Sequence, residues 1–335
     1  MLPTQPGRHS LLCVLDWGLG HASRSLALAA QLEAAGESVH FASSGRAQKF
    51  LERERPDLPV HELPAYKVTY PTRSMPFNVA IQLPRWLRTI WRERRYTEKL
   101  VKKQGFDRVI SDNRFGCYAA NVPSIFLTHQ LHPITNNRLV TWLYQRYLQR
   151  FDGFWVPDYP EEERRISGRL SAVTGYQDVL FIGPLSRLVT TPSHGLQPMN
   201  TCVLALLSGP EPMRSRLETI VIRELKSVPG QHVLVRGLPG GTTSLPDPPP
   251  NVTIHDFADA HLLAQLLPAA RHIVCRSGYS TLMDVYAVTS GDKLILVPTP
   301  GQTEQVYLAE RETKRVGCQW VPDQEDLLLK NLLHF

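Results

Sequence analysis

The sequence predicts an α/β protein with two doubly wound, parallel-sheet (Rossmann-like) domains that face each other across a cleft. Short apolar runs alternate with helix-like segments along all 335 residues, which is the pattern of a parallel sheet covered by helices. Two late apolar runs, 272–275 and 294–297, stop abruptly at turns rich in Gly, Ser and Pro. Strand, turn and helix units of this kind present backbone N–H groups and a positive helix end at the carboxyl edge of the sheet, where anions bind.

The first half of the chain supplies the elements of one domain. Leu11 to Leu15 is an apolar strand, and the Ala- and Leu-rich segment 25–35 is a helix that Gly36 closes as a C-terminal cap. The other strands expected in this half, in chain order, are 38–42, 60–63, 108–111, 124–127, 154–156 and 180–182. Two longer helical stretches cover 85–103 and 139–150.

The second half repeats the same architecture. Its expected strands are 202–207, 232–235, 252–255, 272–275, 294–297 and 318–321, with helices between most of them. Residues 237–250 carry too much Gly and Pro for either element and form a surface excursion. We therefore expect a first domain at 1–186, a linker rich in Pro, Ser, Thr and Gly at 187–200, and a second domain at 201–335.

Composition narrows the class of protein. A hydrophobic content of 42% is enough for two buried cores. No stretch approaches the ~20 apolar residues of a membrane span, and the first apolar run is too short for a secretory signal, so we expect a cytoplasmic protein. The five cysteines are far apart and odd in number, which favours buried reduced thiols over disulfides or a thiolate metal site.

The net charge of +6 is concentrated in one segment. Between Arg85 and Lys103 there are eight basic and two acidic residues, which accounts for all of the excess charge. Helical spacing after Pro84, a favourable first-turn residue, is shown by Trp86, Leu87, Ile90 and Trp91, so the segment is predicted to be a basic amphipathic helix with two tryptophans. It is either a domain helix with solvated arginines or a contact to an anionic membrane at the inner membrane face. No recognised binding motif accompanies it, so we expect no nucleic-acid partner.

The loop after the first strand carries candidate chemistry. Gly18 and Gly20 let the turn close tightly and let a ligand approach the backbone, and His21 follows at the start of the helix. A dinucleotide fingerprint would place a third glycine at Ser23, so NAD binding is disfavoured. A neutral imidazole at His21 suits a general base, and the alternative is a histidine that bonds its own turn.

Other polar residues end the neighbouring strands of the first domain. Asp112, Asn113 and Arg114 follow one strand and His129 follows the next. Parallel strands bring all of them to the edge of the sheet that holds His21. Asp112 either orients the His21 imidazole or caps the following helix, and His129 is an alternative base or an acceptor contact.

The second domain has the candidate donor site. Ser208 and Gly209 offer backbone donors after its first strand, and Arg276 would add a cation to the helix start formed by Ser277 and Gly278. Helix capping alone is the alternative role of the hydroxyl residues Ser277 and Ser280. The remaining candidates follow nearby turns: Phe257 for the base, Ser280 and Thr281 for phosphate, Asp284 for ribose, and Gln302, Glu304 and Gln305 for sugar hydroxyls. No metal-ligand spacing occurs, so we expect a metal-free reaction without a cofactor, in which helix N-termini and Arg276 stabilise the leaving diphosphate.

These motifs together resemble a known family. The order Gly18-Leu19-Gly20-His21, then Arg276-Ser277-Gly278, then 298–305 is similar to inverting glycosyltransferases of the GT-B fold, above all the family 28-like group of the peptidoglycan UDP-N-acetylglucosamine transferase. The resemblance implies a UDP-sugar donor bound by the second domain and a lipid or lipid-linked glycan acceptor bound by the first. It implies that the loop of Gly18 and Gly20 faces the acceptor with His21 as a candidate base, and it puts the phosphate turn at Ser277 and Gly278. It puts the ribose contact at Asp284 and the hydroxyl contacts at Glu304 and Gln305.

The sequence departs from that family at three places and has rival interpretations. The phosphate loop is Ser208 to Glu211 instead of a Gly-Ser-Gln loop, the ribose acid is Asp instead of Glu, and the hydroxyl pair is Glu-Gln instead of Gln-Gln. The loop after the first strand, with Arg24 three residues after His21, also resembles that of the UDP-sugar hydrolases of bacterial nonulosonic-acid synthesis, which use water as the acceptor. A non-catalytic nucleotide-sugar sensor is the third hypothesis, and it would not need His21.

Overall fold

The chain divides into two compact units. The computed structural model describes residues 2–66, 75–134, 137–189, 201–239, 241 and 248–333, and the units are Met1–Leu185 and Ser186–Phe335. The predicted domains end and begin at 186 and 201. Most of the predicted linker, residues 190–200, lies outside the described residues, as do residues 240 and 242–247 of the predicted surface excursion and residues 67–74.

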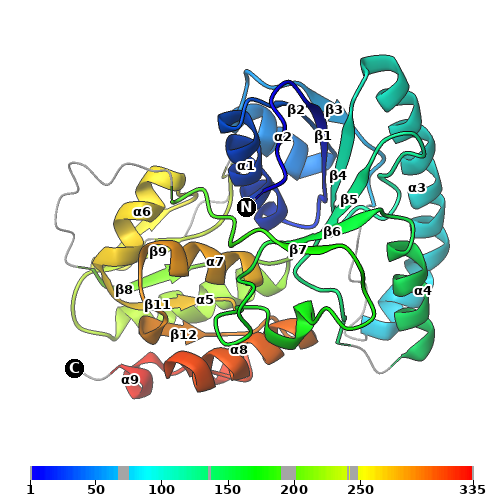
Figure 1. Cartoon of the computed structure of the whole chain (residues 1–335). Coiled ribbons are helices and arrows are strands. Elements are labelled where there is room, and N and C mark those ends of the chain that lie inside the picture. The colour runs from blue at the N-terminus through cyan, green and yellow to red at the C-terminus, as the bar shows by residue number, and fades with distance from the viewer. Residues whose placement is uncertain are drawn as a thin grey trace. The chain divides into compact units, whose positions relative to one another are not determined.

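The first unit is built on a parallel sheet of seven strands in the order β3-β2-β1-β4-β5-β6-β7. In chain order its strands are β1 (His9–Val14), β2 (Ser38–Ser43), β3 (Val60–Glu62), β4 (Arg108–Asp112), β5 (Ser124–Leu127), β6 (Gly153–Val156) and β7 (Val179–Phe181). Its helices are α1 (Leu19–Ala34), α2 (Gly45–Glu54), α3 (Met75–Gln104), α4 (Arg138–Leu148) and the short 3-10 helix η1 (Gly168–Ser171). Figure 1 shows α1 and α2 on one side of this sheet and α3 on the other.

Three helices differ from the sequence predictions. α1 begins at Leu19, six residues before the predicted start, because Gly18 adopts a φ of 88° and turns the chain directly from the loop into the helix. α2 was not predicted. α3 begins at Met75 and runs through Pro84, so this proline lies inside the helix and not in its first turn. Gly36, with a φ of 83°, follows the end of α1 as predicted.

The core of the first unit forms because alternate side chains of each strand face opposite sides. Leu11 and Cys13 of β1 and Val109 of β4 pack with Leu100 and Val101 of α3. The intervening residues of β1, such as Leu12, point to the other face and are equally buried. Burial on both faces is what a parallel sheet covered by helices requires.

The second unit has a parallel sheet of six strands in the order β10-β9-β8-β11-β12-β13. Its strands are β8 (Thr201–Leu206), β9 (His232–Val235), β10 (Val252–His255), β11 (Ala270–Cys275), β12 (Leu294–Leu296) and β13 (Gln319–Trp320). Its helices are α5 (Met213–Lys226), α6 (Ala260–Ala269), α7 (Tyr279–Val288), α8 (Thr303–Val316), α9 (Leu329–Leu332), η2 (Gly291–Lys293) and η3 (Gln324–Asp326). All thirteen strands expected from the sequence are present, some with shifted ends.

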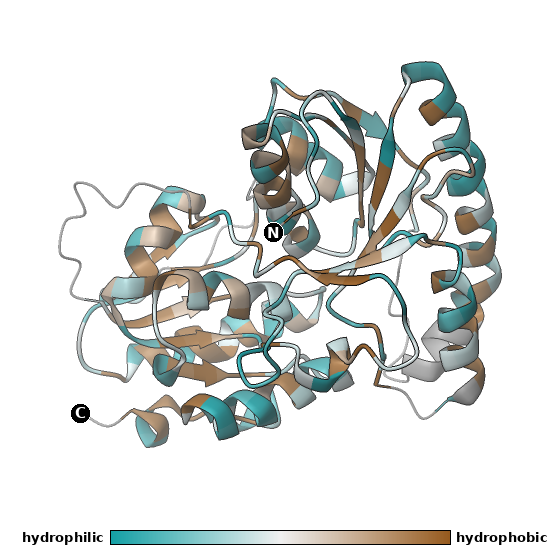
Figure 2. Cartoon of the chain, viewed as in Figure 1, coloured by the Kyte–Doolittle hydropathy of each residue, from teal (hydrophilic) through white to brown (hydrophobic). Residues whose placement is uncertain are grey.

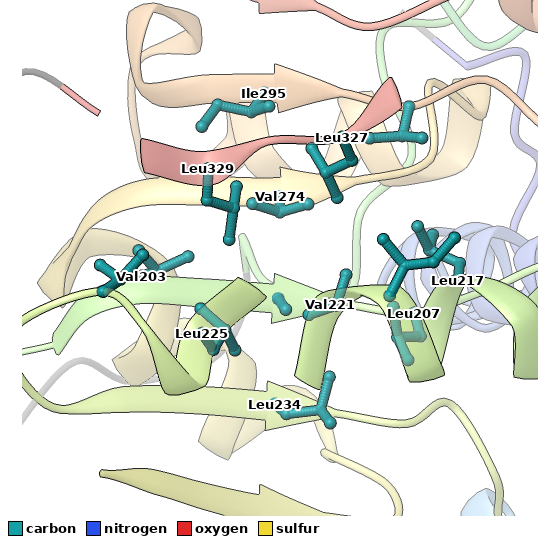
Figure 3. Packing of buried hydrophobic residues seen from close by; sticks show 14 of the residues in the cluster. Val203, Leu207, Leu217, Val221, Leu225, Leu234, Val274, Ile295, Leu327 and Leu329 are labelled. Carbon is teal, nitrogen blue, oxygen red and sulfur yellow. The ribbon is translucent and has the colours of Figure 1, made fainter. Parts of the chain in front are cut away.

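One face of the second sheet is covered by α5 and the C-terminal segment. Leu217, Val221 and Leu225 of α5 pack against Val203 and Val274 of the sheet, together with Leu327 and Leu329 (Figure 3). The strands of this sheet are mostly apolar, whereas α8 carries many hydrophilic turns (Figure 2). α8 is therefore an amphipathic surface helix of the kind that its mixed sequence predicts.

The strand order has a direct consequence for function. In each sheet the chain first adds strands in one direction and then returns to the other side of its first strand, so the order reverses between β1 and β4 and between β8 and β11. At such a switch point the loops after the two strands diverge, and α/β proteins bind ligands there. Among the predicted site residues, His21 follows β1 and Asp112 is the last residue of β4. In the second unit, Gly209 follows β8 and Gly278 follows β11.

Candidate active site

The switch point of the first unit brings His21 and Asp112 together. β1 and β4 pair in parallel with Val14 opposite Asp112, and the backbone N–H of Leu15 donates to the carbonyl of Asp112 at 3.2 Å. Nδ1 of His21, in the first turn of α1, lies 2.9 Å from Oδ1 of Asp112. The structure therefore contains the contact that we expected between the imidazole and the carboxylate.

The pair is enclosed on the carboxylate side and open on the imidazole side. The Asp112 side chain is fully buried, whereas 19% of the His21 side chain is exposed. Burial lowers the pKa of His21, and although the Asp112 carboxylate opposes this effect, the Arg24 guanidinium adds to it. Burial alone would raise the pKa of Asp112, but Arg24 and His21 hold it far below its ordinary value. The resting state is therefore a neutral imidazole beside an ionised carboxylate.

Two further residues of α1 hold Asp112, and neither was among the predicted site residues. Nε of Arg24 donates to Oδ2 of Asp112 at 2.9 Å and its Nη2 donates to Oδ1. Oγ of Ser25 donates to Oδ2 at 3.1 Å. Arg24 lies one helical turn after His21, so its spacing was the signal that could have placed it on the same face.

His129 also reaches this edge, as the sequence predicted, but it is buried. Its side chain follows β5, and its Nδ1 lies 3.2 Å from Nη1 of Arg24. Only 7% of the residue is exposed. A base must reach the acceptor, so the more exposed His21 is the better placed of the two imidazoles.

The predicted acceptor residues fall into two groups. Gly18, Gly20 and Asn113 lie at the exposed or half-exposed edge of the sheet, and Asn113 has a φ of 56°. Arg114 does not lie there, which corrects the prediction for this residue. Its side chain is fully buried, where Nη1 lies 3.1 Å from a Glu93 oxygen of α3 and Nη2 donates to Oγ of Ser44 at 2.5 Å.

Arg114 and Glu93 instead attach α3 to the loop after β4. The hydroxyl of Tyr66 and the N–H of Gly116 donate to Oε2 of Glu93 at 2.7 and 3.2 Å. A side chain at Gly116 would collide with the carbonyl oxygen of Ile90, since a Cβ there would lie 2.2 Å away. Burial raises the pKa of Glu93 to about 7 despite the opposing charge of Arg114.

The switch point of the second unit is formed by loops after β8, β11 and β12. Ser208 and Gly209 are exposed after β8, and Gly209 has a φ of 105°. A Cβ at Gly209 would lie 3.5 Å from Oγ1 of Thr299, in the loop after β12. Thr299 is 2% exposed, and its hydroxyl has no partner among the described residues. Sequence reasoning missed this hydroxyl, because only burial distinguishes it from an ordinary turn residue.

Gly278 begins α7 with the helix end that we expected. It is the N-cap of α7 and provides no capping side chain, and Ser280 and Thr281 of the first turn are half-exposed. Oγ of Ser277 donates to the backbone carbonyl of Gln305 at 2.7 Å, so this hydroxyl is used within the protein. Backbone N–H groups at an uncapped helix start suit an anion.

Arg276 does not face this helix start, which corrects its predicted role. The side chain is 1% exposed, and its Nη1 donates to the carbonyls of Val297 and Pro298 at 3.1 and 2.9 Å. Nη2 donates to the carbonyl of Met213 at 2.9 Å and to Oε1 of Gln324 at 2.7 Å. Burial lowers the pKa of Arg276 to about 10. Its terminal nitrogens therefore hold strand and helix ends together and are not available to a phosphate.

The start of α5 differs from the predicted phosphate loop as well. Oε2 of Glu211 accepts the N–H of Ser215 at 3.2 Å, and Oε1 accepts Nε of Arg214 at 2.5 Å. Although burial acts to raise it, these contacts hold the pKa of Glu211 below its ordinary value. A protein carboxylate therefore occupies the helix end that a phosphate would use.

The predicted hydroxyl-binding residues lie at the start of α8. The amide of Gln305 accepts the N–H of Thr299 at 2.7 Å and donates to Oε1 of Gln302 at 2.6 Å. Gln302 is the N-cap residue of α8. Gln305 therefore fixes the loop that carries Thr299, and Glu304 is half-exposed beside it.

Asp284 and Phe257 complete the predicted donor residues. Oδ1 of Asp284 accepts Oγ of Ser186 at 2.6 Å, and burial raises the pKa of Asp284 to about 6. The residue is half-buried. Phe257 is half-buried between β10 and α6.

The described residues also bear on metal and redox expectations. All five cysteines are buried and unpaired, which confirms the prediction of buried thiols. Within the described ranges no group of three or more His, Cys, Asp and Glu side chains is arranged to hold a metal ion. The metal-free reaction stays a prediction.

Comparison with known proteins gives a consistent class. No protein-family model matches the chain. A protein of Methanosarcina mazei described as an uncharacterized glycosyltransferase is 23% identical over 320 residues, which cover 88% of this chain and 80% of that protein. The solved glycosyltransferase of kitacinnamycin has a TM-score of 0.66 at 15% identity and covers 98% of this chain and 89% of its own.

Two further structures bear on the predicted family and donor. The rhamnosyltransferase SpnG complexed with thymidine diphosphate has a TM-score of 0.62 at 13% identity, covering 95% of this chain and 88% of its own. MurG of Acinetobacter baumannii has a TM-score of 0.54 at 14% identity, covering 98% and 88%. The fold matches that of GT-B glycosyltransferases, and the sequence relatives indicate that the protein is a transferase.

Proposed function

We propose that the protein transfers a glycosyl group from a pyrimidine nucleoside diphosphate sugar to a hydroxyl of a lipid or glycan acceptor, with inversion at the anomeric carbon. The first unit binds the acceptor and the second unit binds the donor. The observation that carries the proposal is the hydrogen-bonded pair of His21 and Asp112 at the switch point of a GT-B glycosyltransferase. Neither the hydrolase nor the sensor hypothesis is favoured by a specific contact.

His21 acts as the base in this proposal. With Nδ1–H donating to Asp112, the lone pair of Nε2 is left to accept the proton of the acceptor hydroxyl. The acceptor oxygen then forms the new bond to the anomeric carbon as the bond from that carbon to the diphosphate oxygen breaks. Attack opposite to the leaving group inverts the configuration, and the nucleoside diphosphate leaves with the bonding electrons.

The second unit meets the charge of the leaving diphosphate. The uncapped start of α7 offers backbone N–H groups, and the Thr299 hydroxyl is buried beside Gly209 without a described partner. Ser280, Thr281 and Ser208 add hydroxyls at the same edge. This set replaces Arg276, whose donors are used within the protein. Asp284 remains our candidate for ribose and Glu304 for a sugar hydroxyl.

The donor base and the acceptor remain to be assigned by experiment. The sequence resemblance favours UDP, and a structurally similar glycosyltransferase was solved with thymidine diphosphate. We test both by incubating the protein with UDP- and TDP-sugars, with and without a membrane extract, and separating the products. Acceptor-dependent transfer supports the proposal. Free sugar released at the same rate with and without extract would instead identify a hydrolase.

Our proposal of a lipid acceptor is based on the exposed residues of α3 and α4. Trp86 packs against Trp17 and the core, with 5.7 Å between the ring centroids, but Trp91 is 57% exposed. The described part of α3 alternates between apolar and hydrophilic turns (Figure 2). The exposed large hydrophobic residues described on the two helices are Ile81, Leu87, Trp91, Tyr96, Leu139, Val140 and Trp142, and exposed arginines of α3 lie among them. Among the described helices, none has the length and apolar character needed to cross a bilayer.

A flotation assay tests this membrane contact. Arginines and tryptophans together suit an anionic lipid surface. We expect the protein to float with vesicles that contain anionic lipid, and Arg92→Glu with Arg95→Glu to reduce the bound fraction several-fold. Lys226→Glu, in the last turn of α5, is the matched control. Unchanged flotation of the double variant would restrict α3 to a structural role.

A further inference from the structure

The charged groups around His21 are not those of a simple histidine and aspartate pair. The titratable or charged side chains that face it are Asp112 at the end of β4, Arg24 on its own helix and His129 after β5. Arg24 contacts all three. Nη2 lies 3.0 Å from Nδ1 of His21, and Nη1 lies 3.2 Å from Nδ1 of His129.

We propose that Arg24 is a positioning residue that binds both carboxylate oxygens of Asp112 and thereby keeps His21 an uncharged base. This inference rests on the proposed function and adds a residue to it. The guanidinium is 1% exposed and the carboxylate is fully buried, so the ion pair is screened from water. Arg24 therefore neutralises much of the negative charge that would otherwise attract a proton to the imidazole.

The geometry also sets the direction of the imidazole. Nε of Arg24 holds Oδ2 of Asp112, and Ser25 holds the same oxygen, so the carboxylate is fixed from one side by α1. Oδ1 accepts Nη2 of Arg24 and also faces Nδ1 of His21, and because an ionised carboxylate only accepts, the ring proton of His21 lies on Nδ1. The guanidinium beside Nδ1 opposes a second proton on the ring, because an imidazolium would place two cations 3.0 Å apart. Nε2 thus keeps its lone pair at pH values where an isolated histidine and aspartate pair would be protonated.

Arg24 also contacts a second imidazole. Its Nη1 lies 3.2 Å from Nδ1 of the buried His129. This contact and the bonds to Asp112 hold the guanidinium in place, with Nη2 beside the His21 ring.

The test measures the protonation of His21 directly. Proteins labelled with ¹⁵N-histidine are titrated by NMR, with His21 assigned from a His21→Gln sample, and the pH profile of kcat/KM is recorded in parallel. In Arg24→Met the midpoint of His21 and the acid limb of the profile should both move to higher pH by about one unit or more. Ser25→Ala removes a hydrogen bond to the same carboxylate without removing charge, so its midpoint should stay close to that of the native protein.

A second pair of variants covers the case in which Arg24→Met does not fold. Asp112→Asn removes the buried carboxylate, so Arg24→Met with Asp112→Asn leaves no unpaired charge. We expect His21 to titrate at higher pH in the double variant than in Asp112→Asn alone. Equal midpoints with and without Arg24 in folded protein would overturn the proposal. A shifted midpoint in a protein that transfers no sugar to any acceptor would support the role of Arg24 and contradict the proposed function.

Discussion

The two switch points have the same topology and different contents. Between β1 and β4, ionisable side chains gather at the edge of the sheet, and His21 reaches solvent while Asp112 and Arg24 are enclosed. Between β8 and β11, the enclosed cation Arg276 donates to backbone carbonyls, and helix starts and hydroxyls form the edge. The first edge is equipped to move a proton and the second to hold an anion.

This difference shows that residue type alone did not define the role. Arg24 follows β1, the first strand of its unit, and Arg276 follows β11, the fourth strand of its unit in chain order. Both arginines are buried. Arg24 bonds a carboxylate beside the candidate base, whereas Arg276 bonds carbonyls that end β12 and begin α5. The partner of the guanidinium decides whether the residue acts on the site or on the fold.

The largest expected effect is the loss of the base. His21→Ala should lower kcat about 10²–10⁴-fold, because proton transfer from the acceptor then depends on water. Affinity for the nucleoside diphosphate should not change, since we propose that the donor binds to the other unit. Steady-state kinetics and calorimetry with UDP and TDP measure the two quantities. His261→Ala, an exposed histidine of α6, is the matched control. Retained turnover in His21→Ala would move the role of base to His129.

The second prediction concerns the stability of the donor unit. Arg276→Met should lower the free energy of unfolding by about 3 kcal/mol, because it leaves buried carbonyls and the Gln324 amide without donors. Thermal and denaturant unfolding measure this loss. Arg271→Met, on the exposed side of the same strand, should cost much less. If Arg276→Met were as stable as native protein but bound diphosphate weakly, Arg276 would be a ligand-binding residue after all.

The third prediction concerns acid and the first unit. His9, His40 and His61 lie together, with Nδ1 of His40 3.1 Å from Nε2 of His61 and the rings of His9 and His40 4.6 Å apart. Burial, with the two neighbouring imidazoles, lowers the pKa of His40 to about 4. The unfolded chain takes up a proton near pH 6.5 and the folded chain does not, so stability falls as the pH drops from 6.5 towards 4.

His40→Leu separates this effect from general acid unfolding. His40 is only half-buried, so water screens part of its charge. Between pH 8 and pH 5 we therefore expect the free energy of unfolding of the variant to fall by on the order of 1 kcal/mol less than that of native protein. Chemical denaturation at the two pH values gives the difference. The same change at the exposed His261 should have no pH-dependent effect. An equal loss on acidification in native protein and His40→Leu would contradict this account.

The smallest expected effect concerns diphosphate affinity at the edge of the second sheet, where we propose that the donor binds. Glu211 places a carboxylate at the start of α5, close to Ser208 and Gly209. Glu211→Gln keeps an acceptor for Ser215 and removes the negative charge, so UDP or TDP should bind a few-fold more tightly. Glu325→Gln changes an exposed glutamate of η3 in the same unit and is the control. Weaker binding by Glu211→Gln would mean that the Glu211 carboxylate itself contacts the ligand.

The sequence predicted the fold and one of the two edges well. Apolar runs bounded by Gly, Ser and Pro identified the strands, because burial on both faces requires such runs. The meeting of His21 with Asp112 followed from parallel pairing of β1 and β4, a property of topology that the sequence pattern determines. The domain that carries each candidate residue could therefore be assigned before any side chain was placed.

The direction of long polar side chains could not be predicted in the same way. Arg114 and Arg276 stand at the expected strand ends, but each turns inward to partners distant in the sequence, Glu93 on α3 and the carbonyls after β12. Arg24 shows the converse, since a residue that looked like part of a helix reaches the buried carboxylate. A guanidinium has five donors and bonds whatever acceptors the fold brings near, and only tertiary structure supplies those acceptors.

Our central claim is that the switch point of the first unit supplies the base and that of the second unit binds the diphosphate. The location of the bound nucleoside diphosphate tests this claim most directly. A crystal structure of the protein soaked with uridine diphosphate or thymidine diphosphate shows it. Our account predicts the diphosphate at the start of α7, with the Thr299 hydroxyl and the turn at Gly209 beside it. A diphosphate bound instead against His21 and Asp112 would contradict it.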